Sequence, residues 1–119
     1  MSGTTPDRGD LVLIPFPFTD LTATKRRPVL VLSPRSYNRR SQDFIVCGVT
    51  SVLTPRPHAV RLRPEDLVRG RIPVESRIRP DKLFTLKQGL AVKSLGRVSP
   101  RVVAHVLREL ASILGLPAP

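Results

Sequence analysis

The stretch TKRRPVLVLS, residues 24–33, sets three consecutive cations directly before an aliphatic run. Lys25, Arg26 and Arg27 favour water or an anion, whereas the four aliphatic residues after the proline favour burial. An aliphatic run without alternation is typical of a central strand, here over residues 28–33. The chain therefore holds its densest positive charge against a core strand, and that charge is either solvated surface or an anion site.

Other segments also have the composition or alternation of strands. They are residues 11–18, 43–51, 59–63 and 75–84, with a last short one within 89–98. Pro15 and Pro17 indicate an edge or a bend in the first of these. Val60 and Leu62 give the segment 59–63 one apolar side. Residues 19–27 and 64–71 are expected to be loops, as are residues 34–42, with room for a helical turn.

The chain ends differently, with the pattern of an amphipathic helix. Ser99 is suited to the N-cap and Pro100 to the first helical position. Apolar residues follow at helical spacing: Val102, Val103, Val106, Leu107, Leu110, Ile113 and Leu114. Gly115 and Pro117 end the helix. Five or six strands and this helix predict a mainly β protein: a small antiparallel barrel covered by the helix. We expect a single domain over residues 10–115, behind a polar lead-in over residues 1–9.

Positive charge dominates the composition. Twenty Lys and Arg face 9 Asp and Glu in 119 residues, a formal net charge of +11. Such a surplus favours polyanionic partners, nucleic acid or an acidic protein. The alternative is a solubility surplus, with arginine raised by genomic base composition. Aromatic residues are only 4%, which disfavours single-strand binding by base stacking.

Several classes of chemistry are disfavoured by the residue types present. A single cysteine excludes an intrachain disulfide, and Cys47 lies in an apolar run typical of the core. Neither Cys/His spacing nor an acidic cluster suggests a metal, so we expect no metal and no cofactor. The N-terminus lacks an apolar signal segment, and no apolar run reaches about 18 residues. We therefore expect a soluble cytoplasmic protein without membrane association.

Reactive side chains lie at the ends of the expected strands. Thr50 and Ser51 end the segment 43–51, and Arg27 precedes the central strand. If these two strands are antiparallel neighbours, Arg27 and Thr50 lie close together. Arg79 and Asp81 share one face of a later strand. Arginine binds phosphate oxygens, a hydroxyl donates a hydrogen bond, and a carboxylate accepts the proton of an RNA 2′-hydroxyl. The set suits metal-independent RNA cleavage; the alternative is a surface ion pair and hydroxyls that merely end a strand.

Several of these segments, in order, resemble the PemK/MazF family of ribonuclease toxins. The likeness rests on RGDLVLIPFPF, KRRPVLVLSP followed by Tyr37-Asn38, FIVCGVTS, SRIRPDKLF and the closing helix, and it runs from about Arg8 to Leu114. Two features depart from the family pattern. The loop before Arg27 lacks the usual Glu-Gln pair and glycine, and Cys47-Gly48-Val49 stand where a proline usually precedes Thr50.

The resemblance implies an SH3-like barrel, usually a homodimer, acting as a sequence-selective endoribonuclease, an mRNA interferase, on single-stranded RNA. It also implies neutralisation by a small acidic antitoxin. Arg27 and Thr50 would be central to catalysis, with Arg79 and Asp81 as acid and base in some members. Because arginine keeps its proton, we assign Arg79 to stabilising phosphate charge. RNA contacts are expected from Lys25, Arg26, Ser51, Arg77 and His58.

Alternative interpretations remain at this level. The same barrel serves toxins that poison DNA gyrase without cutting RNA, and a general RNA-binding module would also be basic. His58 is alternatively a plain exposed loop residue, and His105 a boundary residue of the helix. Either the helix or the strand edges would form a dimer interface.

Overall fold

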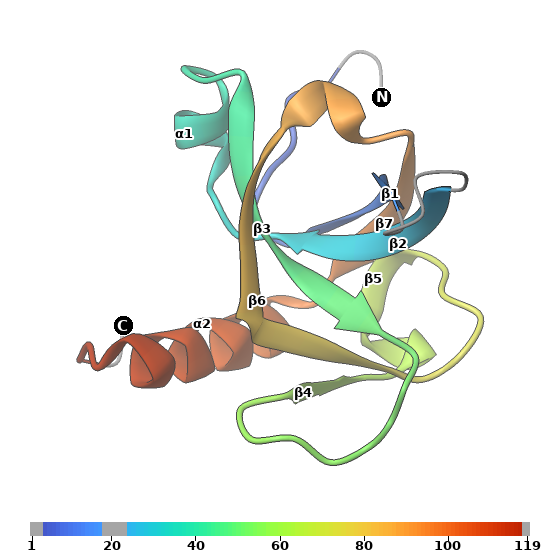
Figure 1. The fold of residues 1–119 in the computed structure, drawn as a ribbon, viewed down its shortest axis with the longest axis vertical. Coiled ribbons are helices and arrows are strands. Elements are labelled where there is room, and N and C mark those ends of the chain that lie inside the picture. The colour runs from blue at the N-terminus through green and yellow to red at the C-terminus, as the bar shows by residue number, and fades with distance from the viewer. Residues whose placement is uncertain (1–3, 18–23, 118–119) are drawn as a thin grey trace.

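The computed structural model of the chain describes residues 4–17 and 24–117 (Figure 1). Within that part, seven strands form one antiparallel sheet and one long helix closes the chain. The strands are β1 (Asp10–Pro17), β2 (Thr24–Val31), β3 (Asp43–Thr50), β4 (Val60–Leu62), β5 (Leu67–Gly70), β6 (Ser76–Lys87) and β7 (Lys93–Val98). The helices are α1 (Arg35–Asn38) and α2 (Pro100–Leu114), with short 3₁₀ turns η1 (Pro64–Asp66) and η2 (Gln88–Leu90).

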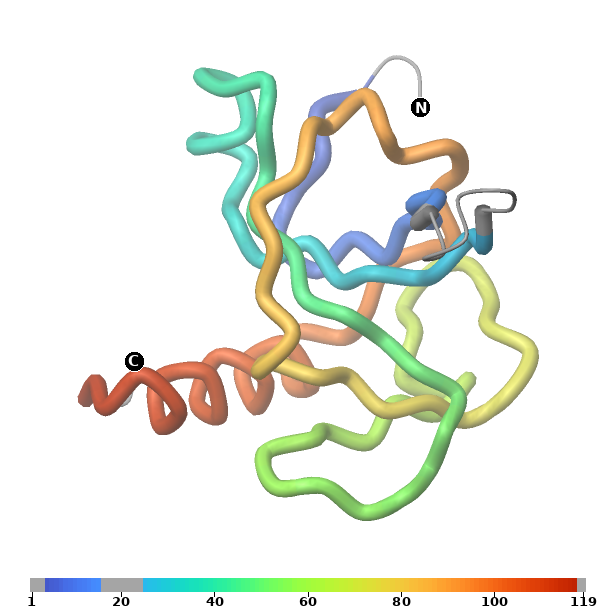
Figure 2. The backbone as a smooth tube through the Cα atoms, viewed as in Figure 1, coloured from blue at the N-terminus to red at the C-terminus, as the bar shows by residue number. Residues whose placement is uncertain are grey.

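The strand order is β4-β6-β3-β2-β1-β7-β5, which puts β2 in the centre. All recorded pairings are antiparallel, and β3 pairs with β6 over nearly its whole length. The sheet curls strongly, so that β4 and β5, the two ends of the order, both lie in the lower half of the molecule (Figures 1 and 2). The expected mainly β, barrel-like sheet with a C-terminal helix is confirmed.

Each face of the sheet carries its own apolar cluster, because alternate residues point to opposite faces. The helix face packs against α2, through residues that include Leu30, Cys47, Val49 and Ile78 from the strands and Val102, Val103 and Val106 from the helix. The far face carries Val12, Ile14, Val29, Val31, Phe44 and Val46, covered by Ala91 and the partly buried Leu86. The core is aliphatic apart from Phe44, as the composition predicts.

The closing helix matches its expected boundaries. Its N-cap, Ser99, accepts a hydrogen bond from the Val102 amide at 3.4 Å. Gly115 ends the helix in the left-handed conformation, with φ of 69°. Val102, Val103 and Val106 are buried, whereas Leu114 at the far end is 54% exposed. The apolar stripe packs against the helix-face cluster as far as Leu110, and only its last residue, Leu114, is exposed.

Some expectations about the elements were wrong in detail. Residues 67–70 form β5 rather than part of a loop, so the described sheet has seven strands and not five or six. The central strand starts at Thr24, so the three cations belong to β2 and not to a preceding loop. Pro15 lies where β1 pairs only with β2, beyond the end of its pairing with β7 at Leu13, which agrees with the expected local edge.

Among the described residues, no helix is long and apolar enough to cross a membrane.

Candidate active site

The predicted site residues from three strands share the far face of the sheet. Arg27 is the Cα partner of Ile14, a far-face core residue, so its side chain belongs to the same face. On the other side of the sheet centre, Thr50 is opposite Arg77 and Gly48 is opposite Arg79. Ile78 lies between these arginines and packs on the helix face, which turns the arginines to the far face.

The strands that carry Arg27 and Thr50 pair only over part of their length. The recorded pairing of β2 and β3 ends at Val29 opposite Gly48. Continued by two residues it would set Arg27 opposite Thr50, but β2 and β3 diverge beyond that point (Figure 1). Arg27 is exposed and Thr50 half-buried. Both side chains therefore belong to the far face, where the two strands separate, and this place between Arg27 and Thr50 is called the mouth. The antiparallel neighbourhood of these strands, expected from the sequence, is confirmed.

Arg79 and Asp81 form a two-bond ion pair. The guanidinium donates from Nε at 3.2 Å and from Nη2 at 2.7 Å to the two carboxylate oxygens. The Arg79 side chain is 17% exposed and that of Asp81 42%. Hydrogen bonding from Arg79 holds the pKa of the Asp81 carboxyl below its usual range, against the opposing effect of burial. Asp81 is thus held as a carboxylate, each oxygen of which accepts one hydrogen bond from Arg79.

A large bulge in β6 changes which side chains reach the far face. Cys47 is opposite Leu83 while its neighbour Gly48 is opposite Arg79, so residues 80–82 have no partner in β3. A Cβ on Gly48 would lie 3.3 Å from the Cβ of Lys82. Position 48 points to the far face, as positions 46 and 50 of the same strand do. The stem of Lys82 therefore covers Gly48 on the far face. Alternation along β6 predicts that Lys82 points to the face opposite Arg79, so Lys82 was not among the predicted site residues. The one sequence signal of the bulge is Gly48, a glycine inside a strand.

The remaining predicted contacts divide into two groups. Lys25 and Arg26 are exposed on β2, and Ser51 is exposed just after β3. Arg77, by contrast, is engaged: its Nη1 donates to Glu75 at 2.8 Å. Glu75 also accepts from Arg61, and these two hydrogen bonds lower the pKa of Glu75 to about 2.

His58 is tied to the terminal helix. Its Nδ1 lies 2.9 Å from Glu109, which also lies 3.5 Å from Nε2 of His105. Hydrogen bonding from His58 lowers the pKa of Glu109. His58 has a left-handed φ of 67°. The contact anchors the loop between β3 and β4 to α2, so the structure does not bring His58 together with the far-face arginines.

Cys47 is a core residue, as expected. It is fully buried, and burial followed by the charge of Asp81 raises the pKa of its thiol to about 12. A protonated, inaccessible thiol is a poor nucleophile. Among residues 4–17 and 24–117, no three His, Cys, Asp or Glu side chains are grouped as metal ligands would be.

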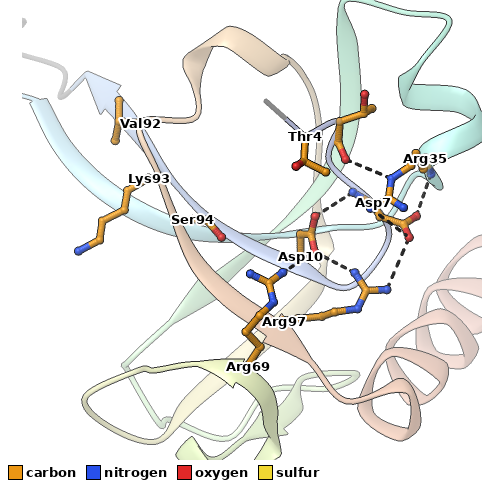
Figure 3. Close-up of a pocket in the computed structure, with 10 residues that line it drawn as sticks. Thr4, Asp7, Asp10, Arg35, Arg69, Val92, Lys93, Ser94 and Arg97 are labelled. Carbon is orange, nitrogen blue, oxygen red and sulfur yellow. Dashed lines mark hydrogen bonds and ion pairs between the residues drawn. The ribbon is translucent and has the colours of Figure 1, made fainter. Parts of the chain in front are cut away.

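A second polar region lies beside the N-terminal lead-in (Figure 3). A cavity of about 670 Å³ is lined there by carboxylates, arginines and hydroxyl groups. Arg97 donates to Asp10 at 2.8 Å and lies 3.6 Å from Asp7, while Arg69 lies 3.7 Å from Asp10. These pairs tie Asp7, which precedes β1, and Asp10, the first residue of β1, to β7 and β5. The cavity continues along β7 to Lys93, which lies opposite Leu13, the residue next to Ile14 in β1.

The fold is that of solved MazF structures. A MazE–MazF structure from Deinococcus radiodurans superposes with a TM-score of 0.79 at 30% identity, covering 96% of this chain and all of that one. A mycobacterial endoribonuclease in complex with its cognate antitoxin superposes with a TM-score of 0.75 at 26% identity, covering 98% and 100%. These likenesses define a class of small toxins built on a curled sheet and one helix.

The sequence agrees with the structural comparison. "Endoribonuclease MazF4" of Mycobacterium tuberculosis is 28% identical over 93 residues, which is 78% of this chain and 83% of that protein. The model of the PemK-like, MazF-like toxins of type II toxin–antitoxin systems matches residues 7–114. The chain belongs to this family.

Proposed function

We propose that the protein is a metal-independent endoribonuclease toxin that cleaves single-stranded RNA at selected sequences. Family membership over residues 7–114, with relatives named as endoribonucleases, carries this proposal. The cations on the far face support it, because a polyanion needs positive charge where the backbone is cut. The net charge of +11 has the same sign.

The proposed reaction is an internal transfer at phosphorus. The 2′-hydroxyl loses its proton and forms an O2′–P bond, the P–O5′ bond breaks, and the 5′ oxygen takes up a proton. The products are a cyclic phosphate and a 5′-hydroxyl end. Charge develops on the phosphoryl oxygens, so donors aimed at them lower the barrier.

Each side chain at the mouth has a role in this reaction. Arg27 offers a planar donor fork, and it has no ion-pair partner among the described residues. Thr50 donates from its hydroxyl. Arg79 adds a second guanidinium, which Asp81 holds in place from the side. Because Asp81 is engaged and its pKa lowered, it suits orienting Arg79 better than taking the 2′-hydroxyl proton.

The partners follow from the same charges. We expect an acidic antitoxin segment to bind the far face and compete with RNA, since solved relatives include complexes with their antitoxins. We also expect a homodimer, acting in the cytoplasm, where mRNA is available.

Cleavage without metal is the direct test. Purified, antitoxin-free protein incubated with a long single-stranded RNA in excess EDTA should release fragments with 5′-hydroxyl ends. Arg27→Ala and Thr50→Val should each lower kcat/KM by about 100-fold or more, because each removes a donor to the phosphate. Urea unfolding should confirm that both variants remain folded.

Two outcomes contradict the proposal. One is intact RNA with a folded, antitoxin-free sample. The other is inhibition of gyrase supercoiling that survives both substitutions, which would assign the protein to the gyrase-poisoning toxins that share this barrel.

A further inference from the structure

The bulge at residues 80–82 brings a further cation to the mouth. In a regular strand, Lys82 would point to the face opposite Arg79. The register shift between Cys47 and Gly48 frees residues 80–82 from pairing. The Lys82 stem then lies over Gly48, 3.3 Å from where a Cβ would be.

Gly48 lies at the centre of the candidate site. It is the Cα partner of Val29 in β2 and of Arg79 in β6. Arg27 is two residues from Val29, and Thr50 is two residues from Gly48 along β3. Neighbouring strands lie about 4.8 Å apart. The Lys82 stem that covers Gly48 therefore lies over β3, between Arg27 on β2 and Arg79 on β6. A Cβ at position 48 would press against the Lys82 stem, which would have to shift by a few tenths of an ångström.

The Lys82 ammonium is available to a ligand. It is exposed, and among the described residues it forms no side-chain hydrogen bond or ion pair. The neighbouring carboxylate of Asp81 gives both of its oxygens to Arg79. The bulge thus separates two roles: Asp81 orients Arg79, and Lys82 projects a flexible point charge.

From this geometry we propose that Lys82 binds a phosphate of the RNA beside Arg27 and Arg79. The inference rests on the proposed endoribonuclease function, and it adds a residue that alternation along the strand assigns to the other face. Lys82 then neutralises charge on the strand being cut, and Gly48 lets the Lys82 stem lie over it without a tight contact.

The test uses a variant that keeps the stem and removes the charge. Lys82→Met preserves an unbranched stem over Gly48. It should lower kcat/KM for RNA cleavage by about tenfold or more. Lys82→Arg should restore cleavage to within a few-fold of wild type. Lys87→Met is the matched control, because Lys87 is exposed at the other end of the same strand, opposite Asp43. It should leave cleavage unchanged.

Salt dependence supplies a readout that a structural role would not move. Binding is measured with an RNA that carries 2′-deoxyribose at the cleaved nucleotide, so that it is not cut by the proposed reaction. Loss of one phosphate contact should reduce the slope of log affinity against log salt by about 0.7 for Lys82→Met, and by nothing for Lys87→Met. An unchanged slope together with cleavage within twofold of wild type overturns the proposal.

Gly48→Ala tests the geometry independently. The added Cβ should displace the Lys82 stem and lower cleavage in the wild-type background. It should have a smaller effect in Lys82→Gly, which lacks the contacting Cβ. An equal effect in both backgrounds overturns the positioning argument. If wild-type protein does not cut RNA at all, the proposed function fails instead, while the salt slopes still report whether Lys82 contacts phosphate.

Discussion

Arg79 and Asp81 show how one ion pair limits the chemistry open to each partner. Because the Asp81 side chain is exposed, the pair contributes little to stability, and its geometry matters more than its energy. The two hydrogen bonds fix the plane of the guanidinium, while the carboxylate loses basicity. The sequence predicted that the two residues share a face, with an ion pair as the alternative to a catalytic role. It did not show that they are directly bonded, which favours charge stabilisation over proton transfer.

Asp66 is a second carboxylate defined by its contacts, and here the role is structural. Its side chain is only 6% exposed and accepts from the backbone amide of Arg63 at 2.8 Å and from that guanidinium at 3.2 and 3.3 Å. Arg101 of α2 also lies 3.5 Å away. Asp66 therefore joins the turn before β5 to the terminal helix. Asp66→Asn should lower the free energy of unfolding by about 1–3 kcal/mol, measured by urea denaturation at pH 7.

The Asp66 carboxylate also predicts how the free energy of unfolding depends on pH. Hydrogen bonding from Arg63 lowers the folded-state pKa of Asp66 below its ordinary value of 3.8. A lowered pKa stabilises the folded state at pH values above the unfolded pKa, and this stabilisation is lost as pH falls through the folded value. The difference in unfolding free energy between wild type and Asp66→Asn should therefore be constant from pH 7 to 5 and shrink below about pH 4. A difference that grows in acid would contradict this assignment.

At the level of elements, the terminal helix depends on its cap and its first turns. Ser99 accepts from the Val102 amide, and its own amide donates to the Asp66 carbonyl at 2.9 Å. Ser99→Ala should cost about 1 kcal/mol of unfolding free energy, because it leaves a helix donor without its cap. Ser112→Ala, at an exposed position near the other end of α2, is the matched control and should be neutral or slightly stabilising. Equal losses in both variants would show that the cap contributes nothing.

Local chemistry predicted the elements well where it was strong. The Ser-Pro start and glycine stop placed α2, and the aliphatic run after Arg27 identified the central strand. β5 was missed because LVRG is short and follows a turn. It exists through its partner: Gly70 lies opposite Gly96, and a Cβ on either would fall about 2 Å from a backbone carbonyl oxygen of the facing strand. Such a close approach depends on two distant glycines and leaves no local pattern.

The candidate site was predictable only as far as alternation holds. Strand pairing brings Arg27, Thr50 and Arg79 to one face; the sequence made the proximity of Arg27 and Thr50 conditional on neighbouring strands and did not predict that β6 pairs with β3. The far-face position of Lys82 could not be predicted from alternation, because the bulge that turns it lies opposite Gly48 in another strand. His58 was expected near RNA from its loop, whereas its contact with Glu109 comes from the packing of α2. The catalytic and RNA-binding roles of these residues stay predictions.

Considered as a whole, the molecule has a buried apolar cluster on each face of its sheet, and the proposed site lies on the far face. The helix face holds the larger apolar cluster, with α2, while the far face holds the smaller one and carries Arg27 where β2 and β3 diverge (Figure 1). A net charge of +11 gives attraction to polyanions from any side. Selective cleavage requires more than net charge. The side chains must be held around one phosphodiester linkage by strands that are paired to one another.

The most direct measurement removes a single oxygen, that of one 2′-hydroxyl, from the substrate. A cleavage site is first mapped on a defined RNA in excess EDTA, and the same RNA is then made with 2′-deoxyribose at that one nucleotide. Cleavage at that linkage should disappear while affinity for the RNA is retained, because the attacking hydroxyl is gone and the phosphate contacts remain. Continued cleavage at the deoxy linkage would contradict the account, since the nucleophile would then come from outside the RNA.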